Sequence, residues 1–192
     1  MASYLDELER IYPKNREEWH RWLKYNHETS PGVWVIYYKK NSSKPRVEYD
    51  EAVEEALSFG WIDSKVNALD EERYMQVFTP RKPGSIWSKH NKRRVHKLTN
   101  EGRMQTAGRD KVERAKQDGS WSFLDDIEAM IIPEDLKGEL EKNKKAHENF
   151  NQFPDSIKKQ ILYWIATAKR ETTRKKRIKL TVESAGQNEK PV

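Results

Sequence analysis

The sequence contains no cysteine among its 192 residues. This excludes disulfide bonds, thiolate metal sites and a cysteine nucleophile. No apolar run reaches the roughly 20 residues that a helix needs to cross a bilayer, so we expect no membrane insertion. The N-terminal segment is acidic and amphipathic, and it lacks the basic start and apolar centre of a signal peptide. These absences together predict a cytoplasmic protein.

Metal and cofactor signatures are absent as well. His20 and His27 share a face of one predicted helix, but they are about 10 Å apart along its axis, too far to share one ion. An acidic ridge on the next predicted helix consists of Asp50, Glu51, Glu54 and Glu55. Such a ridge could hold a hard cation weakly, but carboxylates on one exposed helix usually only solvate it. We therefore predict no metal, no cofactor and no catalytic residue.

The composition is highly charged yet rich in aromatic residues. Charged and hydrophobic residues each make up 35% of the chain, and seven Trp and eight Tyr supply large apolar areas for a core. The net charge is +6, and the excess positive charge belongs to residues 81–119, which hold 12 Lys or Arg and 4 Asp or Glu. A patch of this kind raises the local concentration of phosphate, nucleic acid or an acidic partner.

Local patterns predict an α+β fold. The predicted strands are Val33–Tyr38, Trp61–Ala68 and Arg73–Thr79, which are β-branched, aromatic or alternating in polarity. The last two form a hairpin around an acidic turn. Helices are predicted over Lys14–Glu28, capped by Asn15, and over Asp50–Phe59, ended by Gly60. The result is a small antiparallel β-sheet packed by helices and followed by a helical C-terminal portion.

The pattern becomes purely helical after Gly119. We predict an α+β domain over residues 1–120, a helical C-terminal portion over 121–186 and a flexible tail over 187–192. The helical portion includes an apolar-striped helix at Asp155–Lys169 and a basic helix at Arg174–Ala185. Within the first domain, Ser85 is expected to cap a helix that runs to about Asn100.

The basic turn Thr79–Ser85 is the first candidate site. Free backbone N–H groups at a helix start, beside Arg81 and Lys82, would bind an anion. The alternative is a proline-stiffened connection whose cations are only solvated. The turn is not a P-loop, because it lacks the glycine spacing and the Lys-Ser/Thr ending.

An aromatic pocket around Asp63 is the second candidate. Its carboxylate, between Trp61 and Trp87, could act as an acid or base. We favour the alternative, in which Asp63 is paired with an Arg or Lys of the basic helix and the Trp residues are core. The predicted ligand-binding residues are Trp61, Asp63, Arg81, Lys82, Ser85, Trp87, Lys89 and Asn91.

Seven cations between Lys169 and Lys179 could contact nucleic acid. However, Ile178 and Val182 give this helix an apolar face, and no aromatic residue lies between the cations. We favour a solvated helix that covers the core.

Four segments resemble a known bacterial family. They are Ala56–Asp63 (ALSFGWID), Phe78–Asn91 (FTPRKPGSIWSKHN), Glu101–Met104 (EGRM) and Ala168–Ile178, with AKRETTR and the later Arg177-Ile178. The chain is similar, over about residues 14–185, to the YdeI/OmpD-associated (bacteriocin-protection) proteins. The resemblance implies a soluble bacterial or archaeal protein with a stress- or bacteriocin-protection role, but no mechanism.

These observations lead to one favoured function and two alternatives. We favour a non-enzymatic cytoplasmic protection protein that binds a small anionic ligand or an acidic protein partner through Arg81, Lys82, Ser85 and Lys89. An enzyme that acts on a small anionic substrate through Asp63 is the first alternative. A nucleic-acid-binding module is the second.

Overall fold

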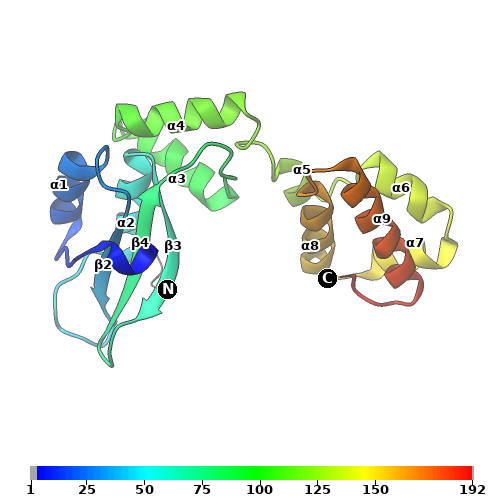
Figure 1. The fold of residues 1–192 in the computed structure, drawn as a ribbon, viewed down its shortest axis with the longest axis horizontal. Helices are drawn as coiled ribbons and strands as arrows, with labels where there is room; N and C mark the ends of the chain where they lie inside the picture. Colours follow the sequence, from blue (N-terminus) through cyan, green and yellow to red (C-terminus); the bar gives the residue numbers. More distant parts are fainter. Residues whose placement is uncertain (1–3, 192) are drawn as a thin grey trace. The chain divides into compact units, whose positions relative to one another are not determined.

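The computed structural model describes residues 4–191, so Val192, at the end of the predicted tail, lies outside the described residues. The chain divides into two compact units (Figure 1): the first ends at Trp121 and the second begins at Ser122. Each unit has its own hydrophobic core, built from different helices.

A four-stranded mixed sheet forms the centre of the first unit, in the order β1-β2-β4-β3. The strands are β1 (Glu9–Ile11), β2 (Val33–Tyr38), β3 (Trp61–Ala68) and β4 (Arg73–Pro80). The three predicted strands and the β3–β4 hairpin are confirmed. The antiparallel pairing of these three strands is confirmed as well. The whole sheet is mixed, because β2 also pairs in parallel with a fourth strand that was not predicted, β1. Its three residues, with one apolar side chain, are too short to show a strand period, so only the tertiary pairing defines them.

Alternate residues of β2 pack on opposite faces of the sheet. Val33, Val35 and Tyr37 contact the main core, whereas Trp34 belongs to a smaller cluster on the other face. Both faces of this strand are therefore buried, which explains its uninterrupted apolar sequence. The helical elements of this unit are the 3-10 helix η1 (Tyr4–Glu7), α1 (Arg16–Asn26), α2 (Tyr49–Ser58), α3 (Lys89–Asn100) and α4 (Thr106–Gln117).

The predicted helix start at Ser85 is wrong. Helix α3 begins at Lys89, and the N-cap is Ser88, whose hydroxyl accepts from the N–H of Asn91. In the preceding segment, the carbonyls of Ser85 and Ile86 accept hydrogen bonds from the buried guanidinium of Arg81. This segment therefore does not form a first turn of the helix. Free helical N–H groups therefore do not lie at the basic turn, which removes the original argument for an anion site there.

A close helix crossing fixes the position of α4. Gly108, in the first turn of α4, packs against the C-terminal end of α2. A Cβ atom at this position would come within 2.2 Å of the Ser58 carbonyl oxygen. The same carbonyl accepts from the N–H of Gln105, immediately before α4. One turn further along, the stem of Lys111 packs over Gly60, whose φ of +76° suits the end of α2. This crossing sets where the cations of α4 lie.

The described residues of the second unit are helical, as predicted. The helices are α5 (Asp125–Glu128), α6 (Glu134–Glu141), α7 (Lys144–Gln152), α8 (Asp155–Ala166) and α9 (Glu171–Gly186). Their core is built around Phe150, Ile161 and Ile165, and Ile178 contributes the apolar face of α9. No helix within residues 4–191 is both long and apolar enough to cross a bilayer.

We predict that Gly108→Ala destabilises the first unit by about 1–2 kcal/mol. The new methyl group meets backbone, which cannot move aside as a side chain can, and overpacking typically costs about 1–3 kcal/mol. This cost exceeds the gain of about 1 kcal/mol in helix propensity. Gly138→Ala is the control, because nothing lies within 4 Å of its would-be Cβ. Urea unfolding should show lower stability for the first variant and equal or higher stability for the second; equal stability of Gly108→Ala and wild type would contradict the close crossing.

Candidate functional site

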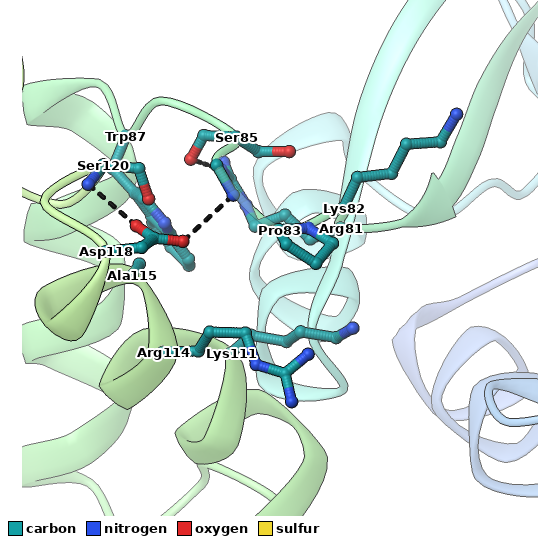
Figure 2. Close-up of a pocket in the computed structure, with 11 residues that line it drawn as sticks. Arg81, Lys82, Pro83, Ser85, Trp87, Lys111, Arg114, Ala115, Asp118 and Ser120 are labelled. Carbon is teal, nitrogen blue, oxygen red and sulfur yellow. Dashed lines mark hydrogen bonds between the residues drawn. The ribbon is translucent and has the colours of Figure 1, made fainter.

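A small cavity lies between the segment 81–87 and helix α4 (Figure 2). Its volume is about 10 Å³, roughly the room that one water molecule needs. The lining residues are Arg81, Lys82, Pro83, Gly84, Ser85, Trp87, Lys111, Arg114, Ala115, Asp118 and Ser120. Thus the cavity joins the predicted basic turn to α4, a helix for which no site residue was predicted.

Arg81 is the central residue of this cavity. It is only 4% exposed, and its guanidinium lies 3.7 Å from the centre of the Trp87 ring. Nη1 donates to the carbonyls of Ser85 and Ile86 at 3.2 Å each. Burial lowers the pKa of Arg81 to about 10, against the opposing charge of Asp63. The side chain therefore stays cationic at neutral pH, although no carboxylate contacts it among the described residues.

Two buried N–H donors at the cavity have no acceptor within residues 4–191: Arg81 Nε and Trp87 Nε1. An unsatisfied buried donor costs about 1–3 kcal/mol, and a charged one costs more. Trp87 is 1% exposed, so bulk water does not reach it freely. The cavity beside these donors is therefore suited to an oxygen atom that accepts hydrogen bonds.

Cations dominate the rim of the cavity. Lys82 and Arg114 are exposed and Lys111 is half-buried, and none of the three forms an ion pair in the part of the chain that the structure describes. Asp118 is the one lining carboxylate. Its oxygens accept from the N–H groups of Gly84, at 3.0 Å, and Ser120, at 2.9 Å, which closes the loop ends (Figure 2).

Hydrogen bonds keep Asp118 ionised. Interaction with Ser120 lowers the pKa of Asp118 most, and the Gly84 N–H and the charge of Arg114 contribute further. The carboxylate is therefore occupied by the N–H groups of Gly84 and Ser120, and the net charge of the lining residues remains positive.

Half of the predicted site residues line this cavity: Arg81, Lys82, Ser85 and Trp87. The others lie elsewhere. Trp61 is a core residue whose Nε1 donates to the His27 carbonyl. Lys89 is exposed at the start of α3, and the Asn91 side chain accepts from Arg94.

The sequence analysis missed the α4 contribution. Lys111, Arg114 and Asp118 follow a spacing of three and four residues, which puts them on one helix face. That spacing was the available signal, but it acquires meaning only when α4 packs beside the 81–87 segment.

The prediction that Asp63 forms an ion pair is wrong. Its carboxylate accepts from two neutral groups, the Tyr49 hydroxyl at 3.0 Å and the Gln76 amide at 2.7 Å. Arg94 of the basic helix pairs instead with Asp50, at 2.5 Å. Nearby, the buried hydroxyl of Tyr37 has no partner within residues 4–191. Burial raises the pKa of Tyr37, and the charges of Tyr74, Asp63 and Tyr49 raise it further.

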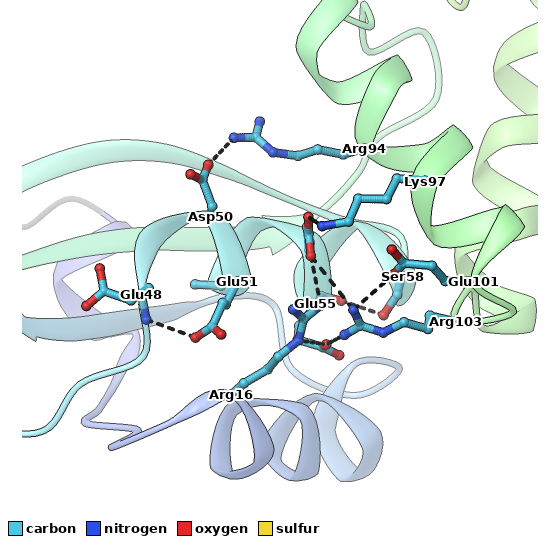
Figure 3. A network of polar contacts seen from close by, with 12 residues as sticks. Arg16, Glu48, Asp50, Glu51, Glu55, Ser58, Arg94, Lys97, Glu101 and Arg103 are labelled. Carbon is cyan, nitrogen blue, oxygen red and sulfur yellow. Dashed lines mark hydrogen bonds and ion pairs between the residues drawn. The ribbon is translucent and has the colours of Figure 1, made fainter.

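Two of the four residues of the acidic ridge on α2 are buried, contrary to the favoured interpretation. The side chains of Glu54 and Glu55 are only 8% and 5% exposed. Arg16 contacts both carboxylates, Lys97 contacts Glu54, and Arg103 contacts Glu55 (Figure 3). The ridge therefore ties α2 to α1, to α3 and to the segment that follows α3.

The other two ridge residues have separate roles. Glu51 accepts from the N–H of Glu48 in a capping box at the start of α2, and Asp50 pairs with Arg94 (Figure 3). The described residues contain no group of three or more carboxylates and histidines placed to hold a metal ion.

We predict that Asp63→Asn lowers the stability by about 1–2 kcal/mol. Both hydrogen bonds go to one oxygen, Oδ2, and the Asn carbonyl can replace it, so only the charge assistance is lost. Asp63→Ala should cost about 2–4 kcal/mol, because the buried amide of Gln76 would lose its acceptor. Thermal and urea unfolding of both variants provide the measurement. A loss of about 3–5 kcal/mol for Asp63→Asn would instead indicate a stranded charge.

Glu54 should make the stability of the first unit depend on pH. Burial raises its pKa, but hydrogen bonds from Lys97 and Arg16 outweigh this and hold the pKa below the usual 4.5. A lowered pKa in the folded state means that the stabilisation is complete above the unfolded value and is lost as the pH falls below about 4.5.

The matched variant for this prediction is Glu54→Gln. We expect the free energy of unfolding of this variant to be lower by about 1–3 kcal/mol at pH 7. The loss is limited because Lys97 is half exposed to water and Arg16 still pairs with Glu55. In urea unfolding from pH 7 to pH 3, the difference between this variant and wild type should shrink. A difference that stays constant over this range would show that the Glu54 charge does not stabilise the fold.

Comparisons with known proteins match the two units of the chain to two different families. Residues 129–188, in the second unit, match the family described as Bacteriocin-protection, YdeI or OmpD-Associated. This confirms the predicted resemblance for the C-terminal part of the chain. The three other segments that suggested it lie within residues 11–111, which match a different family. No curated protein and no solved structure matches the chain. With more than half of its length, residues 11–111, matched, the chain belongs to the family described as Domain of unknown function (DUF8412).

Proposed function

We propose that the first unit binds an oxyanion at the cavity between the segment 81–87 and α4. The observation that carries this proposal is the buried Arg81 cation, which has a free Nε–H and no carboxylate in contact among the described residues. A cation taken out of water is costly unless it is paired and hydrogen-bonded. An anion at this position would supply both the charge and the acceptor.

The size of the cavity indicates how the anion binds. A volume of about 10 Å³ accommodates one oxygen atom but not a whole phosphate or carboxylate. One oxygen would enter beside Arg81 and Trp87, and the rest of the anion would lie at the rim near Lys82, Lys111 and Arg114. Hydrogen bonds from cations to such oxygens are short and about twice as strong as those between neutral groups.

This arrangement favours a binding protein over the two alternatives. Asp63 is not a lining residue of the cavity, and its carboxylate is already hydrogen-bonded to Tyr49 and Gln76. The cations between Lys169 and Lys179 belong to the second unit, which matches the bacteriocin-protection family. We therefore propose a protection protein whose first unit recognises an anionic molecule, and its cytoplasmic location stays a prediction from the sequence.

The Trp87 indole N–H provides a site-specific test. We expect its NMR resonance, assigned with Trp87→Phe, to shift saturably when sulfate or phosphate is added at constant ionic strength. An acceptor at Nε1 changes that proton directly. Chloride should not reproduce the shift. A Trp87 resonance that does not respond to any oxyanion would contradict the proposal and leave the cavity to a water molecule.

Variants of α4 provide matched controls for the same titration. Lys111→Gln and Arg114→Gln should each weaken binding by about fivefold, the loss expected for one charge-assisted contact. Lys116→Gln should leave binding unchanged, because Lys116 pairs with Glu113 and does not line the cavity. Equal affinity in all three variants would show that α4 takes no part in binding.

Short duplex DNA separates the nucleic-acid alternative from a small-anion site. A protein that neutralises several phosphates loses affinity with a log–log salt slope of about −0.9 per contact. Binding of DNA with a slope of several units, together with no response of Trp87 to small oxyanions, would favour a nucleic-acid-binding module instead.

A further inference from the structure

A second pocket lies on the outer face of α1. Its volume is about 430 Å³, within the range of small-molecule sites. The lining residues are Arg16, Glu17, His20, Arg21, Lys24, Tyr25, Glu55 and Arg103. None of them lines the cavity beside Arg81. The two pockets are therefore built from different residues of the first unit.

A buried carboxylate orients His20 in this pocket. Nδ1 lies 2.7 Å from Oε2 of Glu55, and a carboxylate only accepts, so the proton of a neutral imidazole is on Nδ1. Nε2 then has no partner within residues 4–191, and the side chain is 40% exposed. Glu55 itself is held by Arg16 and Arg103, at 2.5 Å each. This fixes the direction of the imidazole more firmly than at an ordinary surface histidine.

The spare charge of the pocket is positive. Arg16 and Arg103 are neutralised by the buried Glu54 and Glu55. Arg21 and Lys24 are exposed, line the pocket and form no ion pair among the described residues. They stand one and four positions after His20, so all three side chains project from neighbouring positions of α1.

We infer that this pocket is a second anion site, which binds the phosphate group of a small molecule with His20 as a hydrogen-bond donor. A protonated imidazole offers Nε2–H to an oxyanion, whereas a neutral one offers a lone pair that repels it. Arg21 and Lys24 supply the further positive charge that a dianion needs. The pocket is large enough for the rest of the molecule, unlike the cavity at Arg81.

Binding at this site is coupled to protonation of His20. The charged groups that line the pocket around the imidazole are Arg16, Glu17, Arg21 and Lys24 on α1, Glu55 on α2 and Arg103 after α3. A bound dianion attracts the positive charge of a protonated His20, so the affinity rises as the pH falls and one proton is taken up.

Sulfate is the probe for this coupling, because it stays a dianion between pH 5 and pH 8 and only the protein titrates. We expect the His20 ring resonances to shift saturably with sulfate, while those of His147, in the second unit, do not. As the pH rises from 5 to 8, Kd should increase by up to about tenfold per pH unit, the limit for one linked proton. Inorganic phosphate should bind the same site, and acetate should bind more weakly.

Variants test the site and leave the contacts of Arg16 and Arg103 with Glu55 in place. Arg21→Gln and Lys24→Gln should each weaken sulfate binding by about two- to fivefold, and His20→Gln should remove its pH dependence. Lys65→Gln, an exposed change on β3, is the control and should bind like wild type. Lys111→Gln should affect Trp87 but not His20, which separates this site from the proposed cavity at Arg81.

Two results would overturn the inference. One is a His20 shift that grows linearly and is the same with chloride, since that is screening rather than binding. The other is unchanged sulfate affinity in both Arg21→Gln and Lys24→Gln.

Discussion

Glu54 and Glu55, in the C-terminal half of α2, place two adjacent negative charges in the interior of the first unit. The ion pairs that neutralise these charges hold several of its helices together. A buried carboxylate is tolerated only when cations and donors surround it. Arg16 reaches them from α1, Lys97 from α3 and Arg103 from the segment before α4. Because α4 starts just after Arg103, the same contacts also help to place α4.

Both proposed sites depend on this arrangement. Glu55 orients His20 in the pocket on α1, and the position of α4 brings Lys111 and Arg114 to the cavity beside Arg81. The two sites use charge in opposite ways. At α1 the buried charge is negative and already paired, so its cations hold the site together. At the cavity the buried charge is positive and has no carboxylate in contact among the described residues, which is the basis of the proposed anion site.

The close crossing at Gly108 is a steric constraint of the same importance. Only a residue without a side chain lets α4 approach the carbonyl of Ser58. Electrostatic contacts and this crossing therefore act on one helix from two directions. The second unit has an apolar core of its own and shares none of these contacts among its described residues, in agreement with its match to a separate family.

The local sequence was sufficient to predict the secondary structure that depends on residues close together in the chain. The strands β2, β3 and β4, the caps at Asn15 and Gly60 and the helical C-terminal portion follow from side-chain period and backbone preference, which act over a few residues. The Arg and Lys residues of the basic turn are also evident from the sequence alone. What only the tertiary structure decided was the use of each charge. Burial of Arg81 removed the helix start at Ser85, neutral donors took the place of an ion pair at Asp63, and Glu54 and Glu55 became interior residues. The last two outcomes depend on partners 13 to 48 residues away, because the energy of a charge is set by what surrounds it in space.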